Sequence, residues 1–276
     1  MGAFAGWDMP LLYGSARDEH LAVRRASGVF DVSHMGQLEV TGAGARDALQ
    51  ALLTNDVTAL GPGQGQYTLL CQDDGGVIDD LIVYALADRF LLVVNASNIA
   101  ACRERLEGRL PAGVELADRS PEIAMLALQG PGWAEALRPL AATPLAFSLD
   151  YFEIGEDVIA GVPSLIARTG YTGEPGVELM CPWDAAPALW DALERVPQGG
   201  RRVPRAHELD AGLARVAGPR DQARDPGDHV LPDLEVVERE RERRGGERAE
   251  RLGPARALEG EHRHLGRPVG HLHAGR

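Results

Sequence analysis

Short apolar runs alternate with turns rich in glycine, proline and aspartate along the first 196 residues of the chain. Apolar runs of this length, bounded by turn residues, are typical of β-strands rather than helices. Turn residues at 73–76 and 87–88 separate three neighbouring runs, so residues 67–95 are expected to form a three-stranded antiparallel meander. The full set of expected strands covers residues 36–40, 67–71, 77–86, 89–95, 122–129, 164–170 and 176–181.

Three further segments carry apolar side chains at the three- and four-residue steps of an amphipathic helix. One covers residues 97–110, and Ser97 or Asn98 is its expected N-cap. A second follows residue 129 and places Pro131 near its first turn. A third begins after its expected cap, Asp184. The apolar stripe of this third helix consists of Leu189, Leu193 and Val196.

Together these elements predict an α+β fold in which antiparallel sheets pack against helices. Residues 1–196 are expected to form the folded core, as two interleaved α+β subdomains. Residues 197–276 differ, because they contain no aromatic residue, isoleucine, methionine or cysteine. Burial of so few large apolar groups does not offset ordering entropy, so a poorly ordered tail is expected. Out-of-frame translation and a metal-binding histidine cluster between His262 and His273 are alternative interpretations of this region.

Composition excludes several classes of protein. The formal net charge of −13 argues against a general nucleic-acid binder. No apolar run approaches the roughly 18–20 residues of a membrane span, and no membrane association is expected. The first residues lack the pattern of a secretion signal, so a cytoplasmic protein is expected. Cys71, Cys102 and Cys181 lie far apart without metal-ligand spacing, which indicates free, buried thiols.

Two adjacent carboxylates, Asp79 and Asp80, interrupt the apolar strand expected at residues 77–86. Side chains alternate between the two faces of a strand, so one carboxylate shares a face with Ile78 and the other does not. One of them is therefore expected to enter the core or to lie at its edge.

A similar combination occurs at residues 168–179, where a turn rich in glycine and containing Tyr171 precedes a strand that carries Glu178. A single carboxylate of this kind most often faces solvent. Two such placements, together with the tyrosine, indicate a pocket. Partial burial would raise the pKa of each carboxylate, and hydrogen-bond donors on a ligand would lower it.

Two other motifs predict no chemistry of their own. Residues 41–49 have the first two glycines of a dinucleotide-binding turn, but Asp47 stands in the third position and the preceding strand alternates polar and apolar residues. A plain strand–turn–helix junction is the better interpretation. His34 has no partner at catalytic spacing, and a lone histidine is more often structural than a ligand.

Several of these stretches resemble the aminomethyltransferase, or T-protein, family of the glycine cleavage system. They include "GGVIDDLIVY" and "RTGYTGEPGVELM", and they occur in the order found in the family. Several long motifs in one order are far more specific than any single motif. The matching stretches cover residues 4–13, 28–36, 52–57, 75–84, 93–98, 126–131 and 168–180.

The resemblance implies a reaction that transfers the one-carbon unit of an aminomethyl group from the lipoyl arm of H-protein to tetrahydrofolate, releasing ammonia. It implies that Asp80 is the catalytic aspartate and that Asp79 faces the opposite side of the strand. It also implies that Glu178 accepts paired hydrogen bonds from the pterin. No metal and no nicotinamide cofactor are expected. The remaining folate contacts implied by the family are Met35, Asn95, Tyr171 and, from residues 218–227, Arg220.

The resemblance nearly disappears after residue 196, so the family's C-terminal β-barrel domain is expected to be degenerate or missing. Two other functions remain open. One is the folate module of an amine-demethylating oxidase, which shares this fold. The other is a folate-binding relative without transferase activity, either a regulatory protein or an inert fragment.

Overall fold

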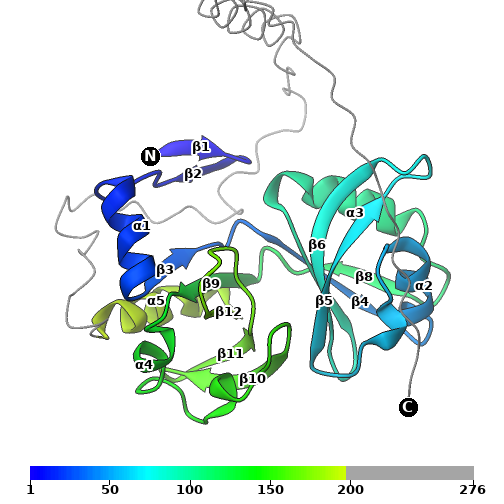
Figure 1. Ribbon diagram of the computed structural model, residues 1–276. Coiled ribbons are helices and arrows are strands. Elements are labelled where there is room, and N and C mark those ends of the chain that lie inside the picture. The colour runs from blue at the N-terminus through cyan, green and yellow to red at the C-terminus, as the bar shows by residue number, and fades with distance from the viewer. Residues whose placement is uncertain (197–276) are drawn as a thin grey trace, which may run out of the picture. The chain divides into compact units, whose positions relative to one another are not determined.

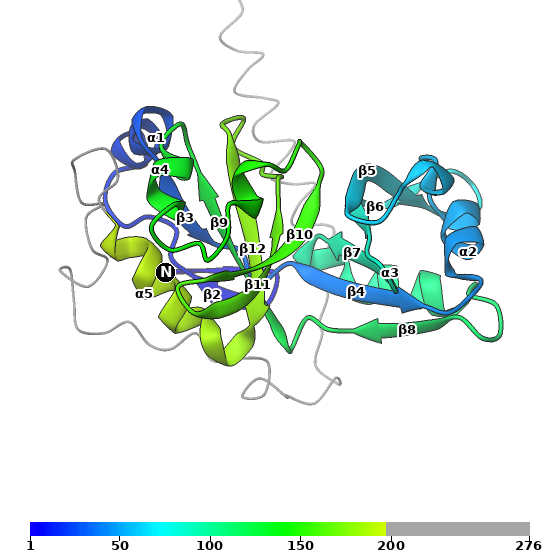
Figure 2. The same ribbon diagram turned by 90° about the horizontal axis from the view of Figure 1, so that it is seen from below.

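The expected meander forms one side of the first of two five-stranded antiparallel sheets in the computed structural model, which describes residues 1–196 (Figures 1 and 2). β5 (Gln64–Cys71), β6 (Val77–Ala85) and β7 (Phe90–Val94) pair in sequence order. β4 (Gly36–Thr41) and β8 (Glu115–Asp118) complete this sheet, here called sheet I, in the order β5-β6-β7-β4-β8.

The second sheet, here called sheet II, takes strands from both sides of sheet I in the sequence. β3 (Gly28–Asp31) precedes sheet I and pairs with β9 (Ile123–Gln129), which follows it. The strand order is β10-β11-β12-β9-β3. The other strands of the fold are β10 (Ile154–Ile159), β11 (Val162–Ala167) and β12 (Gly176–Pro182) of sheet II, and the separate hairpin of β1 (Gly2–Phe4) and β2 (Trp7–Met9).

All three segments expected to be helical are helices, but their first turns differ from expectation. Asn98 is the N-cap residue of α3 (Ile99–Glu107), yet its side chain makes no cap hydrogen bond. Pro131 lies before Gly132, the N-cap residue of α4, and so outside the helix. Asp184 belongs to a 3₁₀ turn, and Ala185 is the N-cap residue of α5. The helices are α1 (Ala16–Arg25), α2 (Ala45–Leu52), α3, α4 (Trp133–Leu137) and α5 (Ala186–Arg195).

The described residues contain three apolar clusters. One face of sheet I packs against α2 and α3, and one face of sheet II packs against α4 and α5, where Leu189 and Leu193 are buried as expected. The third cluster joins the remaining faces of the two sheets, through Tyr84 of sheet I and Met125 and Met180 of sheet II. The side chains that face each other across this third cluster are the ones that surround the candidate site.

The three cysteines of residues 1–196 are free thiols. Cys102 and Cys181 are buried free thiols, as expected, whereas Cys71 is half-buried. Burial raises the pKa of Cys102 to about 12 and that of Cys181 to about 11, so both thiols stay protonated at neutral pH. No helix among the described residues is long and apolar enough to cross a membrane.

Candidate functional site

A β-bulge lies just before the two adjacent aspartates and changes which face of β6 Ile78 occupies. Leu70 pairs with Asp79 and Cys71 pairs with Val77, so Ile78 is the extra, unpaired residue. Ile78 and Asp79 therefore both face the apolar cluster under sheet I, although strict alternation would have put Ile78 and Asp80 on one side. Asp79 is 2% exposed, and Asp80 is exposed on the opposite face. One carboxylate enters the core, as expected.

Asp79 is held by neutral donors from the residue that follows β7 and from the start of α3. The backbone N–H of Asn95 donates to Oδ2 at 2.8 Å, and the side-chain amide of Asn95 donates to Oδ1 at 2.9 Å. The Asn98 amide also donates to Oδ1, at 2.5 Å, and the Cys102 thiol lies 3.6 Å from Oδ2. Asn98 thus contacts a buried carboxylate instead of capping α3. These donors satisfy a group that would otherwise be costly to bury.

Asp80 lies on the face of β6 that is turned toward sheet II. Its Oδ1 accepts from Nδ2 of Asn95 at 3.1 Å, and its Oδ2 accepts from the Tyr67 hydroxyl at 3.2 Å. Loss of hydration, followed by the hydrogen bond to Asp80 and its charge, raises the pKa of Tyr67. The structure therefore brings together Asp80 and Asn95, both expected at the site, and adds Tyr67. Tyr67 occupies a diagonal position on the neighbouring strand, which long side chains can reach.

Glu178 ends a chain of hydroxyl groups that begins on sheet I. The Thr169 hydroxyl donates to Glu178 Oε2 at 2.5 Å, and the Tyr84 hydroxyl lies 2.9 Å from the Thr169 oxygen. Because Thr169 has only one hydroxyl proton, Tyr84 is the donor in the second bond. Burial raises the pKa of Glu178, and burial together with the nearby Glu178 charge raises the pKa of Tyr84. Among the described residues, Oε1 of Glu178 accepts no hydrogen bond and remains available.

The side chain of Gln129, which is 1% exposed, holds the loop that carries Tyr171 through hydrogen bonds. Its side-chain amide donates to the carbonyls of Thr169 and Val177, and its oxygen accepts from the Thr172 hydroxyl. A Cβ atom at Gly170 would lie 1.9 Å from the Gln129 side chain, so this position requires glycine. The glycine-rich motif is therefore a consequence of packing around a buried amide.

The other residues expected at the site are placed as follows. Met35 packs against the apolar cluster between the two sheets. Tyr171 is fully exposed and makes no described hydrogen bond, so its ring is not enclosed by other described residues. His34 is half-buried against Phe4, with ring centroids 5.6 Å apart, and burial lowers its pKa, opposed by Asp31. Arg220 lies outside the described residues.

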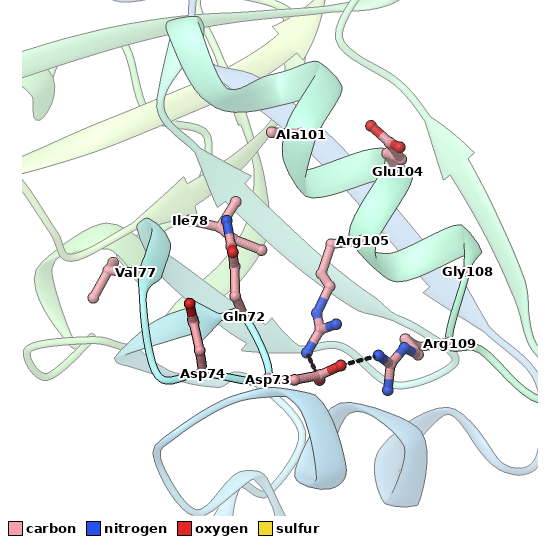
Figure 3. A pocket seen from close by; sticks show the side chains of 10 residues that line it. All are labelled: Gln72, Asp73, Asp74, Val77, Ile78, Ala101, Glu104, Arg105, Gly108 and Arg109. Carbon is pink, nitrogen blue, oxygen red and sulfur yellow. Dashed lines mark hydrogen bonds and ion pairs between the residues drawn. The ribbon is translucent and has the colours of Figure 1, made fainter.

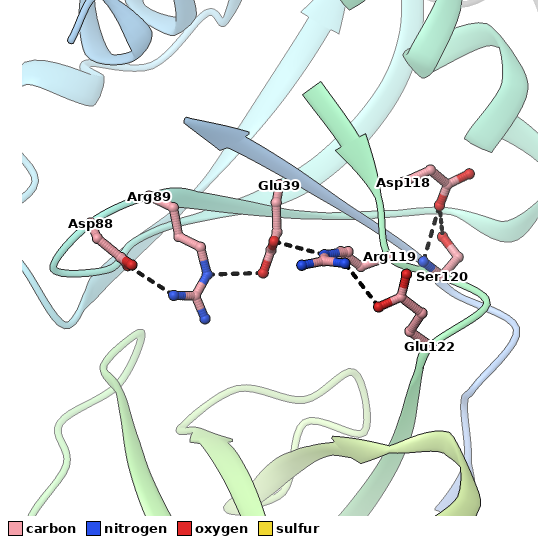
Figure 4. Close-up of polar contacts among 7 residues, drawn as sticks. All are labelled: Glu39, Asp88, Arg89, Asp118, Arg119, Ser120 and Glu122. Carbon is pink, nitrogen blue, oxygen red and sulfur yellow. Dashed lines mark hydrogen bonds and ion pairs between the residues drawn. The ribbon is translucent and has the colours of Figure 1, made fainter. Parts of the chain in front are cut away.

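Two hollows of the described chain lie away from these residues. One, of about 780 Å³, is lined by the β5–β6 turn and α3, where Asp73 pairs with Arg105 and Arg109 (Figure 3). The other, of about 610 Å³, includes Glu39 and Arg119. Figure 4 shows that Glu39 joins Arg89 to Arg119 in a row of surface ion pairs. Neither hollow contains Asp80 or Glu178, and exposed ion pairs contribute little to stability.

We expect Glu178→Gln to raise the free energy of unfolding, relative to the wild type, by more at pH 8 than at pH 4. The folded-state pKa of Glu178 is raised above its unfolded value, so its contribution to stability is present below the unfolded pKa and is lost as pH rises through the folded one. Glutamine stays neutral and avoids this loss. The test compares urea unfolding of variant and wild type at both pH values. Glu156→Gln, an exposed change on β10, is the control, and an equal difference at both pH values would contradict the expectation.

Comparison with known proteins agrees with this architecture. The family model described as "GCVT N-terminal domain" matches residues 1–202. The aminomethyltransferase of Frankia alni is 48% identical over 202 residues, 72% of this chain and 54% of the relative. That of Mycobacterium avium is 41% identical over 242 residues, 85% of this chain and 62% of the relative. The crystal structure of glycine cleavage system aminomethyltransferase T from Bartonella henselae is 37% identical, with a TM-score of 0.63, over 70% of this chain and 52% of that one.

These matches define the fold as that of a glycine cleavage T-protein, with antiparallel sheets and packed helices. The chain belongs to the GCVT aminomethyltransferase family, through the N-terminal domain of that family. It spans about half the length of the Frankia alni relative and of the Bartonella henselae structure, at 54% and 52%. The C-terminal β-barrel, expected to be degenerate or missing, falls outside the described residues.

Proposed function

We propose that this chain carries out the tetrahydrofolate-dependent step of glycine cleavage. The one-carbon unit passes from the aminomethyl group on the lipoyl arm of H-protein to tetrahydrofolate, and ammonia and the reduced lipoyl arm are released. Tetrahydrofolate is a co-substrate in this reaction, and the protein works in the cytoplasm. The observation that carries the proposal is the placement of Asp80 and Glu178, one on each of the two sheet faces that meet across the apolar cluster.

Asp80 is assigned the catalytic role. Its exposed carboxylate has two donors, Asn95 and Tyr67, which fix both oxygens without neutralising the charge. Such a group orients a folate nitrogen and accepts its proton as the carbon is transferred. Asp79, buried and fully hydrogen-bonded on the other face, has no access to a substrate.

Glu178 is assigned to the pterin ring. Oε1 is available, and Oε2, which accepts one hydrogen bond from Thr169, keeps a second acceptor site. The carboxylate therefore fits an amino-pyrimidine edge that presents parallel N–H donors. The raised pKa of Glu178 means that burial disfavours its charge, and donors from the ligand would restore it. Met35 supplies an apolar wall, Asn95 an amide and Tyr171 an aromatic face. Arg220 completes the proposed set of folate contacts.

The first experiment is a tetrahydrofolate titration of the full chain and of Glu178→Gln. We expect saturable binding by the wild type and affinity at least about tenfold weaker in the variant, because one paired acceptor is lost. Glu156→Gln, with the same charge change on exposed β10, should bind like the wild type. Absence of binding by a folded wild-type chain would contradict the proposal and favour an inert family member.

Turnover separates the remaining alternatives. A transferase consumes aminomethyl-lipoyl H-protein in the presence of tetrahydrofolate, whereas a regulatory relative binds folate without turnover. The folate module of an amine-demethylating oxidase would accept folate but not the lipoyl substrate. Loss of the lipoyl-bound carbon, followed with purified H-protein, separates the transferase from both alternatives.

A further inference from the structure

The proposed reaction gives no role to Asp79, a buried ionisable group. This carboxylate is 2% exposed, and none of its donors is charged. No ion pair involving Asp79 occurs among residues 1–196. Burying a carboxylate without a counter-charge is costly, and an apolar side chain would fill the same place more cheaply. The hydrogen bonds that Asp79 makes therefore deserve a functional explanation.

Asn95 connects Asp79 to Asp80. Its side-chain nitrogen has two protons and lies near three acceptors, which are Oδ1 of Asp79 at 2.9 Å, the backbone carbonyl of Asp80 at 2.9 Å and Oδ1 of Asp80 at 3.1 Å. One proton is directed to Asp79, so the other is shared between the two oxygens of Asp80. The backbone N–H of Asn95 also donates to Asp79. Asp79 thus holds both the main chain and the side chain of Asn95.

The carboxylate of Asp79 also accepts hydrogen bonds from α3 and its N-cap residue. Asn98 and Cys102, at the beginning of α3 and one turn along it, donate to the two carboxylate oxygens. Burial and the charge of Asp79 raise the pKa of Cys102, which keeps the thiol protonated as a donor. Asp79 therefore links α3 to the amide that contacts Asp80.

We propose that Asp79 is a positioning residue: it fixes the orientation of the Asn95 amide and, through that amide, the carboxylate of Asp80. The catalytic consequence rests on the proposed function, in which Asp80 handles the proton of tetrahydrofolate. The geometric claim concerns Asp79, Asn95 and Asp80 alone. Asp79 itself touches no substrate.

The substitution Asp79→Asn isolates this role, because it keeps the shape and removes one acceptor. An N–H₂ group in place of Oδ2 would meet the backbone N–H of Asn95, which cannot turn away. In place of Oδ1 it would meet the Asn95 amide, and flipping that amide would turn its oxygen toward the oxygens of Asp80. The first arrangement pushes the main chain of Asn95 away from Asp79, and the second turns the Asn95 amide away from Asp80.

The geometric claim is tested by NMR on the full chain, using the side-chain amide signals of Asn95. We expect Asp79→Asn to shift these signals, and the matched control Asp157→Asn to leave them in place. Asp157 is another buried carboxylate, 7% exposed on β10, and it accepts from Thr143 and Val158. Unchanged Asn95 signals in Asp79→Asn would overturn the proposal. If that variant does not fold, Asn98→Ala, which removes one donor to Asp79, must shift the same signals.

The consequence for the site is tested by initial rates of one-carbon transfer in a double-mutant cycle. We expect Asp79→Asn to lower the rate about tenfold in the wild-type background, and to add almost nothing in an Asn95→Ala background. Equal losses in both backgrounds would mean that Asp79 does not act through Asn95. A wild-type chain that binds no tetrahydrofolate would contradict the proposed function instead, while the NMR result would still decide whether Asp79 positions Asn95.

Discussion

Asp80→Asn is expected to reduce the rate of one-carbon transfer by about 10²- to 10⁴-fold, the usual contribution of a positioned proton-transfer group. Asparagine keeps one oxygen to accept from Asn95, and its amide can donate to the Tyr67 oxygen, so the geometry is preserved. Only the negative charge is lost. Tetrahydrofolate affinity should therefore change by less than about threefold, because the pterin is held by Glu178. Initial rates with lipoylated H-protein and a parallel folate titration measure the two effects separately.

Asp47→Asn provides the control for this loss of charge, since Asp47 is exposed on α2 and far in sequence from the strand that carries Asp80. Its rate should match that of the wild type. An Asp80→Asn variant that retains most of the wild-type rate would remove Asp80 from the catalytic role. A variant that loses folate affinity in the same proportion as rate would make Asp80 a binding residue.

Gly130→Ala is expected to cost at least about 3 kcal/mol of the free energy of unfolding. Gly130 has a φ of +125°, and an added Cβ atom would lie 2.6 Å from the carbonyl oxygens of both Val23 and Ala26. These are backbone atoms at the end of α1, so relief requires moving the helix away from β9. Urea unfolding followed by circular dichroism measures the cost.

Gly161→Ala is the matched control for the backbone conformation. Gly161 has a φ of +83° but nothing within 4 Å of the added atom, so only the conformational strain of about 1 kcal/mol applies. The difference between the two variants contains the cost of the collision with α1 and the added strain of the larger φ at Gly130. Equal losses of unfolding free energy in the two variants would show that the close approach of α1 to Gly130 does not affect stability.

Sequence periodicity predicted the meander, whose contacts are local, but it missed two other local elements, α1 and β10. The meander of β5, β6 and β7 is joined by short turns, and its apolar runs are long enough to be distinctive. β3 was not predicted, because it is four residues long and is stabilised by pairing with β9, almost a hundred residues away. Such long-range pairing leaves little trace in a short segment.

The residues of the candidate site were likewise predicted only in part. Asp80, Asn95 and Glu178 were singled out within motifs, and the structure joins Asp80 to Asn95 by a hydrogen bond. Tyr67 and Gln129 were missed, because their roles depend on strand register and on glycines that make room for a buried amide. The orientation of Ile78 relative to Asp79 was also beyond the reach of simple alternation, which cannot locate a bulge.

Because of that bulge, the number of residues in the β5–β6 turn does not by itself determine which face of β6 each side chain occupies. In a regular hairpin, one residue gained or lost at the turn shifts the register and exchanges the two faces of the strand. Here the extra residue, Ile78, lies between the turn and the two aspartates, so an irregularity at the tip is absorbed before it reaches them. The hairpin therefore accommodates one additional residue near its tip while the exposed and the buried aspartate keep their places.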